Sequence, residues 1–504
     1  MQDLDSHFLT YSSGDDIYSQ FCDIREYFFG AGRGDIGVTM SKAPVDCAKK
    51  YELLCRHHAW QLLGLDAPPR ASSVEARSVE SDIAQAFRSS KFMEKEERLQ
   101  DEFWELLDEA HTWALVAILL EEHYTRTDGK ENLEEAYRVR RERVELLSEW
   151  RRSAQQMFQL QLDDPSPRGN TARLVKLVTE WLEVSERDAP WTCPDLDICD
   201  WKLTISQMKR VNRKWDPDFF SRRGPDEEGL MHNTDKCAED RLLDAVLCCL
   251  RRGNREAAER LCTRYKQGHR AAMLAGADFF EDPSLHPGVS SARRHGNQHR
   301  ELWKRACREL VKGDEMASPM ERAVLGVVSG DPEHAQKMAT SWKDWLWAEL
   351  KATQEIILSG APFPDTFWAD MLRQIPSPLA EGIFSNPMEV VQHGLLHSER
   401  IESGVHPQVF EEVFSLFLNH NQLPRLVDSQ ERNFQGWARG RRFQALRDPN
   451  LPRSLQDDTV SQVRITGVPH FARFAAHLML LLRDSNMIPT GEVENEEALE
   501  NIEA

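Results

Sequence analysis

The sequence predicts an all-α protein, built as an irregular helical solenoid. Apolar residues recur at three- and four-residue steps over long stretches, most clearly from Lys95 to Tyr124, and this is the period of an amphipathic helix. Strand patterns with a period of two are sparse. Helix pairs follow one another without the signature of a named repeat family, so we expect pairs that stack on their neighbours without a regular repeat.

Composition limits the class of function. The chain has 504 residues, which is too long for one compact core, and its 40% hydrophobic residues suffice for folded units. With 63 Lys and Arg against 83 Asp and Glu, the formal net charge is −20, so we expect no direct binding of nucleic acid. The ten cysteines are scattered and no apolar signal core follows Met1, as expected in a reduced intracellular compartment.

The first half of the chain predicts long helices. We expect a mixed N-terminal segment with a first helix from Lys49 to Leu65. The later helices are predicted over residues 95–124, 132–160, 171–186 and 201–212. The stretch 132–160 is predicted as one continuous helix, because Arg and Glu recur there at i,i+3 and i,i+4 and would line one exposed face.

The predicted helix lengths change in the second half of the chain. Short helices are predicted from Asp240 to about residue 358, and longer helices return over residues 388–483 after a proline-rich stretch. The most apolar run, residues 471–482, includes Arg473 and His477. It is too short and too polar to span a membrane, so we expect no membrane span.

One short helix carries more apolar side chains than a single neighbour can cover. On a helix over residues 240–252, the apolar residues occupy an arc of roughly 200°, about twice the usual buried stripe. The arc consists of Leu242, Leu243, Ala245, Val246, Leu247, Cys249 and Leu250. Gly253 and Asn254 end the helix, with Gly253 free to adopt a positive φ. Helices over 256–266 and 269–275 follow, and we expect one side of the arc to face a partner.

Several sequence motifs follow one another in order along the chain. The segment RLLDAVLCCLRRGNREAAERLCTRYKQGHRAAMLAG at residues 241–276 most clearly resembles the scaffold nucleoporin 84/107 family. Matching elements also occur upstream and downstream, at residues 106–113 (LLDEAHTW), 215–218 (WDPD), 302–307 (LWKRAC), 321–330 (ERAVLGVVSG), 341–350 (SWKDWLWAEL) and 471–483 (FARFAAHLMLLLR). Two features depart from the family. His269 stands where a Trp is common, which puts the packing of that helix in question, and the sequence ends where the family continues into a C-terminal tail.

The resemblance implies a fold and a location. The family shares the ancestral coatomer element with vesicle coats, in which a trunk ascends, makes a U-turn through a crown of short helices and descends again. On this basis residues 1–94 are an N-terminal segment and 95–236 the ascending trunk. Residues 237–360 are then the crown and 361–504 the descending trunk, and we expect the tail to be absent. The implied location is the nuclear envelope, in the Y-shaped outer-ring complex of the nuclear pore.

The resemblance also implies partners. The crown is expected to bind the hub nucleoporin of the 145C/96 family, and the missing tail a 133-family nucleoporin. The implied role is pore assembly and nucleocytoplasmic transport, including mRNA export. The residues predicted to bind the partner are Leu243, Val246, Leu247, Leu250, Leu261, Cys262, Tyr265, Met273 and Leu274.

Other functions have weaker support. A vesicle-coat scaffold would share the architecture but few of these sequence motifs. A helical metal-dependent hydrolase could use His393 and His397, whose i,i+4 spacing suits zinc, but Gly394 replaces the general base and no third ligand follows. We therefore expect neither an enzyme nor a cofactor or metal.

Three further patterns are assigned structural roles. Gly32–Gly37 fits the pattern G-x-G-x-x-G, yet no strand precedes it. Pro44 follows soon after, and we interpret it as evidence against a helix N-terminus positioned to bind phosphate. Cys47, Cys55, His57 and His58 match no known metal-binding spacing. The basic run of Arg293, Arg294, His299, Arg300, Lys304 and Arg305 is interpreted as a solvated loop and helix face, with a patch for an acidic partner as the alternative.

Overall fold

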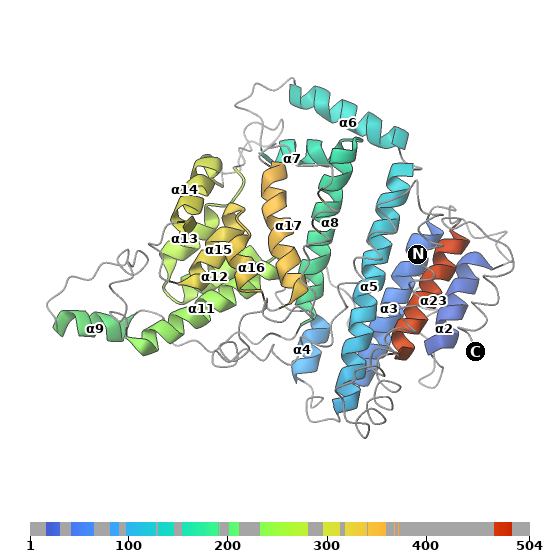
Figure 1. Cartoon of the computed structure of the whole chain (residues 1–504), viewed down its shortest axis with the longest axis horizontal. Helices are drawn as coiled ribbons and strands as arrows, with labels where there is room; N and C mark the ends of the chain where they lie inside the picture. The colour runs from blue at the N-terminus through green and yellow to red at the C-terminus, as the bar shows by residue number, and fades with distance from the viewer. Residues whose placement is uncertain are drawn as a thin grey trace, which may run out of the picture. The chain divides into compact units, whose positions relative to one another are not determined.

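The predicted all-α class is confirmed by a computed structural model of the chain (Figure 1). The structure describes residues 17–30, 42–64, 81–89, 97–127, 130–145, 154–189, 191, 201–210, 232–280, 296–312, 318–339, 341–358, 367, 371 and 468–485. Within these ranges the regular elements are all helices, and a single β-type bridge joins Phe279 to Asn297. The predicted helices over 388–467 lie outside the described residues.

The chain divides into two compact units. The first comprises residues 1–69, 86–128 and 403–504, and the second comprises residues 70–85 and 129–402. The boundary near residue 85 falls inside the short helix α4 (Asp82–Ser89). The predicted division into N-terminal segment, trunk and crown uses other boundaries, and it stays a prediction.

The first unit is a bundle of helices from both ends of the chain. Its members are α2 (Ile17–Phe29), α3 (Ala43–Leu62), α5 (Glu97–Thr127) and α23 (Val468–Asp484). Helices α3 and α5 pack along each other, and α2 and α23 pack against them. Phe21 of α2 stacks on Tyr51 of α3 with ring centroids 4.5 Å apart, and Trp113 of α5 meets Phe474 of α23 at 4.9 Å.

The polar residues of the apolar run in α23 lie inside this bundle. Arg473 is buried and binds Glu109 of α5, with its Nε 3.2 Å from Oε1 and a second contact from Nη2 to Oε2. His477 is equally buried and lies against Phe21 and Tyr51. At the end of α23, Asp484 accepts from Arg25 of α2 at 2.6 Å. The ion pairs of Arg473 and Asp484 and the ring contacts of His477 therefore fix α23 in the bundle.

Helix α3 begins earlier than predicted. It starts at Ala43 rather than near Lys49, and Pro44 occupies its first turn. A proline is well tolerated there, because the first N–H groups of a helix have no partner within the helix and the fixed φ of proline suits the position. The interpretation of Pro44 as an argument against a helix start is therefore wrong. Gly32–Gly37 lie outside the described residues.

The second unit is a stack of shorter helices. These are α6 (Lys130–Glu145), α7 (Ala154–Asp163), α8 (Pro167–Arg187), α9 (Lys202–Arg210), α11 (Asn233–Arg251), α12 (Arg255–Arg264), α13 (Gly268–Ala275), α14 (Arg300–Lys312), α15 (Pro319–Ser329), α16 (Glu333–Lys337) and α17 (Trp342–Leu358). Helix α8 packs against α7 and α17. Glu183 of α8 accepts from the indole nitrogen of Trp347 at 3.3 Å and pairs with Lys351 at 2.6 Å.

The prediction of one helix over residues 132–160 is wrong. The chain forms two helices there, and α6 packs against α7. Arg140 of α6 pairs with Asp163 at the end of α7, at 2.5 Å, which a single straight helix could not allow. The exposed pair of Arg138 with Glu135 supports α6, whereas α7 packs against α8 and α17. The packing of α7 against α8 and α17, rather than the local pattern of Arg and Glu, therefore decides that the chain forms two helices here.

The buried His477 makes the stability of the chain depend on pH. Burial, together with the nearby cations of Arg473 and Arg25, lowers its pKa from 6.5 to about 4. The unfolded chain therefore takes up a proton below pH 6.5 that the folded chain refuses until about pH 4. The stabilisation that neutral His477 contributes is fully present above pH 6.5. As the pH drops below 6.5, the free energy of unfolding falls by up to about 1.4 kcal/mol per pH unit.

We expect the variant His477→Gln to lose part of this dependence. Its unfolding free energy should fall less steeply than that of the wild type between pH 6.5 and pH 4, as measured by urea unfolding at a series of pH values. The two proteins differ only at residue 477, so the difference between the two slopes reports His477. Identical slopes would contradict the assignment.

Candidate partner-binding surface

The wide apolar arc of α11 is covered by the chain itself. Every apolar residue of the arc is buried, and the most exposed of them, Leu247, retains 7% of its surface. Helices α12 and α15 pack against α11, and α9 touches it as well. The expectation that one side of the arc remains bare for a partner is therefore wrong. The physical reason is that at least two neighbouring helices, α12 and α15, pack against α11 rather than one.

The turn between α11 and α12 is formed as predicted. Gly253 adopts φ +66, where a side chain would be strained. Asn254 then donates its backbone N–H to the carbonyl of Cys249 at 2.9 Å, and its side-chain oxygen accepts from the N–H of Ala257 at 2.9 Å. One residue thus ends α11 and caps α12. This tight turn brings α12 back against α11.

A buried arginine ties α13 to α11 and α15. Arg270 donates from Nη2 to Glu239 of α11 at 2.5 Å and from Nε to Glu321 of α15 at 3.0 Å. Its Nη1 reaches Gln267 at 3.2 Å, and Glu239 also accepts from the indole of Trp201 at 3.0 Å. Burial alone would lower the pKa of Arg270, but the two carboxylates outweigh it and raise the pKa. The guanidinium is therefore a fixed cation of the interior.

His269, which departs from the family pattern, stays at the surface. Its ring lies 6.0 Å from the ring of Trp201, which precedes α9. Its neighbour Arg270 makes the buried contacts of the helix instead. The position therefore contributes an exposed ring contact rather than a core side chain.

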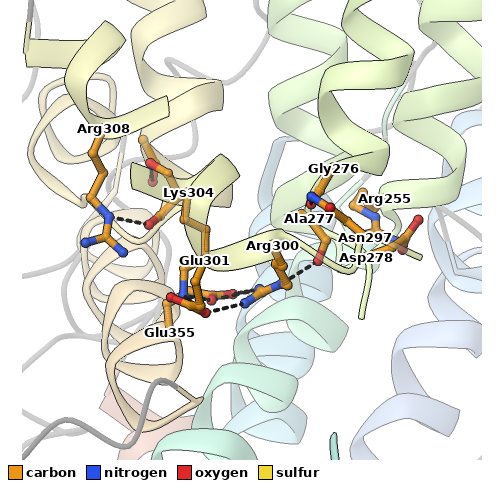
Figure 2. Close-up of polar contacts among 12 residues, drawn as sticks. Arg255, Gly276, Ala277, Asp278, Asn297, Arg300, Glu301, Lys304, Arg308 and Glu355 are labelled. Carbon is orange, nitrogen blue, oxygen red and sulfur yellow. Dashed lines mark hydrogen bonds and ion pairs between the residues drawn. The ribbon is translucent and has the colours of Figure 1, made fainter. Parts of the chain in front are cut away.

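The basic run around α14 is only partly a solvated face. Arg300 and Lys304 are buried, and Figure 2 shows both pointing toward Glu355 of α17. Arg300 donates to both oxygens of Glu355, at 2.7 and 2.8 Å, and to the carbonyl of Ala277 at 2.7 Å. Lys304 pairs with Glu355 at 3.0 Å and with the exposed Glu301 at 3.1 Å. The interpretation as a solvated face is wrong for these two residues.

The nine residues predicted to bind the partner are therefore mostly interior residues. All of them except Met273 are buried, and Met273 is half-buried. The exposed side chains of the same region come from other positions. On α13 they are His269 and Ala272, and on α14 they include Leu302, Ala306 and Leu310. Leu302, with 66% of its surface exposed, is the most exposed large hydrophobic side chain in the described ranges.

The cysteine and histidine group of α3 does not form a metal site. Cys47 and Cys55 are buried, and burial raises the pKa of the Cys47 thiol to about 12, where the thiolate required by a metal is scarce. Among the described residues, His, Cys, Asp and Glu nowhere gather in a group of three that could hold a metal ion. His393 and His397 lie outside these residues.

None of the described helices has the length and apolarity needed to cross a membrane. In each of the two units the described residues form packed helices, held together by apolar contacts and buried ion pairs. Helical arrays of this class use their surfaces to bind other proteins. The candidate surface in this chain is the exposed side of α13 and α14.

The chain belongs to the nuclear pore protein 84 / 107 family, whose model matches residues 103–504. The nuclear pore complex protein Nup107 of Rattus norvegicus is 23% identical over 410 residues, which cover 78% of this chain and 39% of the rat protein. Nup107 of Homo sapiens is 28% identical over 222 residues, which cover 40% of this chain and 24% of the human protein. Nucleoporin nup107 of Schizosaccharomyces pombe is 26% identical over 280 residues, which cover 54% of this chain and 30% of the yeast protein.

The family confirms the resemblance found in the sequence. It places the chain in the nuclear pore complex of the nuclear envelope. The family is structural rather than enzymatic. The chain spans only 39% of the length of the rat relative.

The burial of α11 gives a first prediction for this region. Leu243→Asp or Leu247→Asp places a carboxylate among apolar side chains, which costs several kcal/mol and approaches the stability of a whole domain. We expect circular dichroism to show a loss of helix and a lower melting temperature. The control Thr263→Asp changes an exposed residue of α12 and should leave both unchanged. A folded Leu243→Asp protein with an unaltered melting temperature would contradict the burial of α11.

The buried cations of α14 give a second prediction. Glu355→Gln removes the negative charge that Arg300 and Lys304 share, and breaking one side of a buried ion pair costs about 3–5 kcal/mol. The midpoint of urea unfolding should fall accordingly. Glu301→Gln is the matched control, because this carboxylate also contacts Lys304 but is 61% exposed, and it should have little effect. Equal effects of the two variants would refute the role of Glu355.

Proposed function

We propose that this chain is a scaffold nucleoporin of the pore's outer ring, which binds the hub nucleoporin of the 145C/96 family through the crown at residues 237–360. The family match over residues 103–504 is the observation that carries the proposal. The ordered motifs from residue 106 to residue 483 support it. Through this contact the chain would serve pore assembly and nucleocytoplasmic transport, including mRNA export.

The trunk-and-crown division belongs to the same proposal. Residues 95–236 would ascend, 237–360 would make the U-turn and 361–504 would descend. The packing of α23 against α2, α3 and α5 supports a return of the chain, because residues 468–484 lie against helices of the N-terminal part. A 133-family nucleoporin would bind to a tail that follows this region in longer relatives.

The hub would dock on the outer face of α13. Arg270 and Leu274 face the interior, so the exposed Ala272 lies on the opposite side of this helix, and the half-buried Met273 and Ala275 lie on its two flanks. Side chains this small let a partner helix approach closely, and Met273 adds an adaptable apolar contact. A standard interface buries about 800 Å² per partner, so neighbouring exposed residues would have to contribute.

A direct binding measurement tests this proposal. Ala272→Arg adds a long charged side chain at an exposed position, so the fold should be kept while the affinity for a hub nucleoporin of the 145C/96 family falls at least about tenfold. Isothermal titration calorimetry with the purified hub protein measures this. The matched control is Ala136→Arg on α6, also an exposed alanine in a helix.

Two results would contradict the proposal. If the wild-type chain fails to bind the hub protein, the proposed function is wrong. If it binds but Ala272→Arg and Ala136→Arg have equal affinity, the docking face is elsewhere.

A further inference from the structure

The outer face of α14 exposes leucines where a surface helix normally has polar residues. Its inner face is occupied by Arg300, Lys304, Cys307 and Val311, all of them buried. The opposite side carries Leu302, Ala306 and Leu310, spaced four residues apart, and Leu302 and Leu310 are 66% and 36% exposed. Residues four apart lie on one face of a helix. We call these three residues the outer stripe of α14.

Arg305 and Glu309 flank the outer stripe. Both side chains are exposed, and no ion pair to either one is found within the described part of the chain. Because they are four residues apart, they lie one turn from each other on the same flank of the stripe. The stripe therefore has an apolar line of two leucines around a small alanine, with one cation and one anion beside it.

We propose that the outer stripe of α14 binds the outer stripe of a second copy of this chain, with the two helices antiparallel. Around a two-fold axis at Ala306, Leu302 meets Leu310 of the second copy and the two alanines face each other, so the backbones can approach closely. The same flanks face each other in such a pair, and Arg305 then meets Glu309 of the second copy. The contact occurs twice, as two-fold symmetry requires.

Charge complementarity favours a second copy as the occupant. Reversing the direction of α14 places its own anion opposite its own cation, so the stripe is complementary to itself in charge and in size. The contact is small, because a helix of 13 residues is about 20 Å long and covers less than the roughly 800 Å² per partner of a standard interface. The association is therefore expected to be weak.

Charge reversal tests the pairing. Arg305→Glu leaves two anions on the flank, and Glu309→Arg leaves two cations. Two copies of the same variant therefore repel each other at this flank. We expect sedimentation equilibrium of the purified wild-type chain, at up to several hundred micromolar, to show a monomer–dimer equilibrium. Each variant alone should dimerise at least about tenfold more weakly, because two attractive contacts become repulsive.

The decisive experiment mixes the variants Arg305→Glu and Glu309→Arg. Both contacts are then attractive again, since the anions of one chain face the cations of the other, and the mixture should regain the wild-type Kd. A variant that had merely lost its fold would not recover on mixing. The control Glu135→Arg reverses an exposed charge on α6 and should dimerise like the wild type. Leu302→Ser should dimerise weakly and not recover on mixing with either charge variant.

Other outcomes overturn the proposal. A wild-type chain that stays monomeric throughout the concentration range, or charge variants that stay monomeric when mixed, would refute it. If Leu302→Ser instead lowers the affinity for the hub nucleoporin while the wild type stays monomeric, the stripe is a hub contact. This inference does not depend on the proposed function, because Ala272→Arg tests hub binding separately and should leave self-association unchanged.

Discussion

The arrangement of the short helices depends on buried arginines that bind carboxylates of other helices. Arg270 joins α13 to α11 and α15 through Glu239 and Glu321, and Arg300 joins α14 to α17 through Glu355. Removing one partner of a buried ion pair costs about 3–5 kcal/mol of stability, because the other charge is left buried and unpaired. Each guanidinium also requires acceptors in fixed directions. A stack of short helices with modest apolar faces thereby acquires one defined packing.

The first unit uses the same device at its own core. Arg473 and Glu109 are both buried, and they join a helix near the end of the chain to α5. Around them lie Trp113 and Phe474, which make the apolar contacts. The aromatic rings supply the buried area, while the ion pair fixes the position of α23 along the bundle. The two units thus share a principle, in which apolar burial gives the stability and charge pairs give the register.

Because charged side chains occupy buried positions on these helices, some apolar side chains lie at the surface. On α14 two buried positions are taken by Arg300 and Lys304, and the leucines are on the outside. On α13 the buried positions are taken by Arg270 and Leu274, and small residues remain outside. The binding faces proposed for this region therefore consist of exposed leucine and alanine with a half-buried methionine, and the apolar side chains of α11 belong to the interior. A scaffold gains from this division, because its contact surfaces can be occupied without disturbing the core.

The sequence by itself determined the helical class, the family and most of the helices. The period of residues 95–124 predicted α5, and the Gly253–Asn254 turn and the short helix after it were also predicted, because capping and periodicity are local properties. Helix α11 was predicted to begin at Asp240, but it begins at Asn233. Only the tertiary structure decided which faces are buried. Periodicity shows which residues share a face, but not how many neighbours cover it, so the arc of α11 was wrongly assigned to a partner. Nor could it show that Arg270 is an interior residue, since its carboxylates come from 31 and 51 residues away. A charge at a helix position is exposed or buried according to whether a distant partner meets it, and only the folded chain supplies that partner.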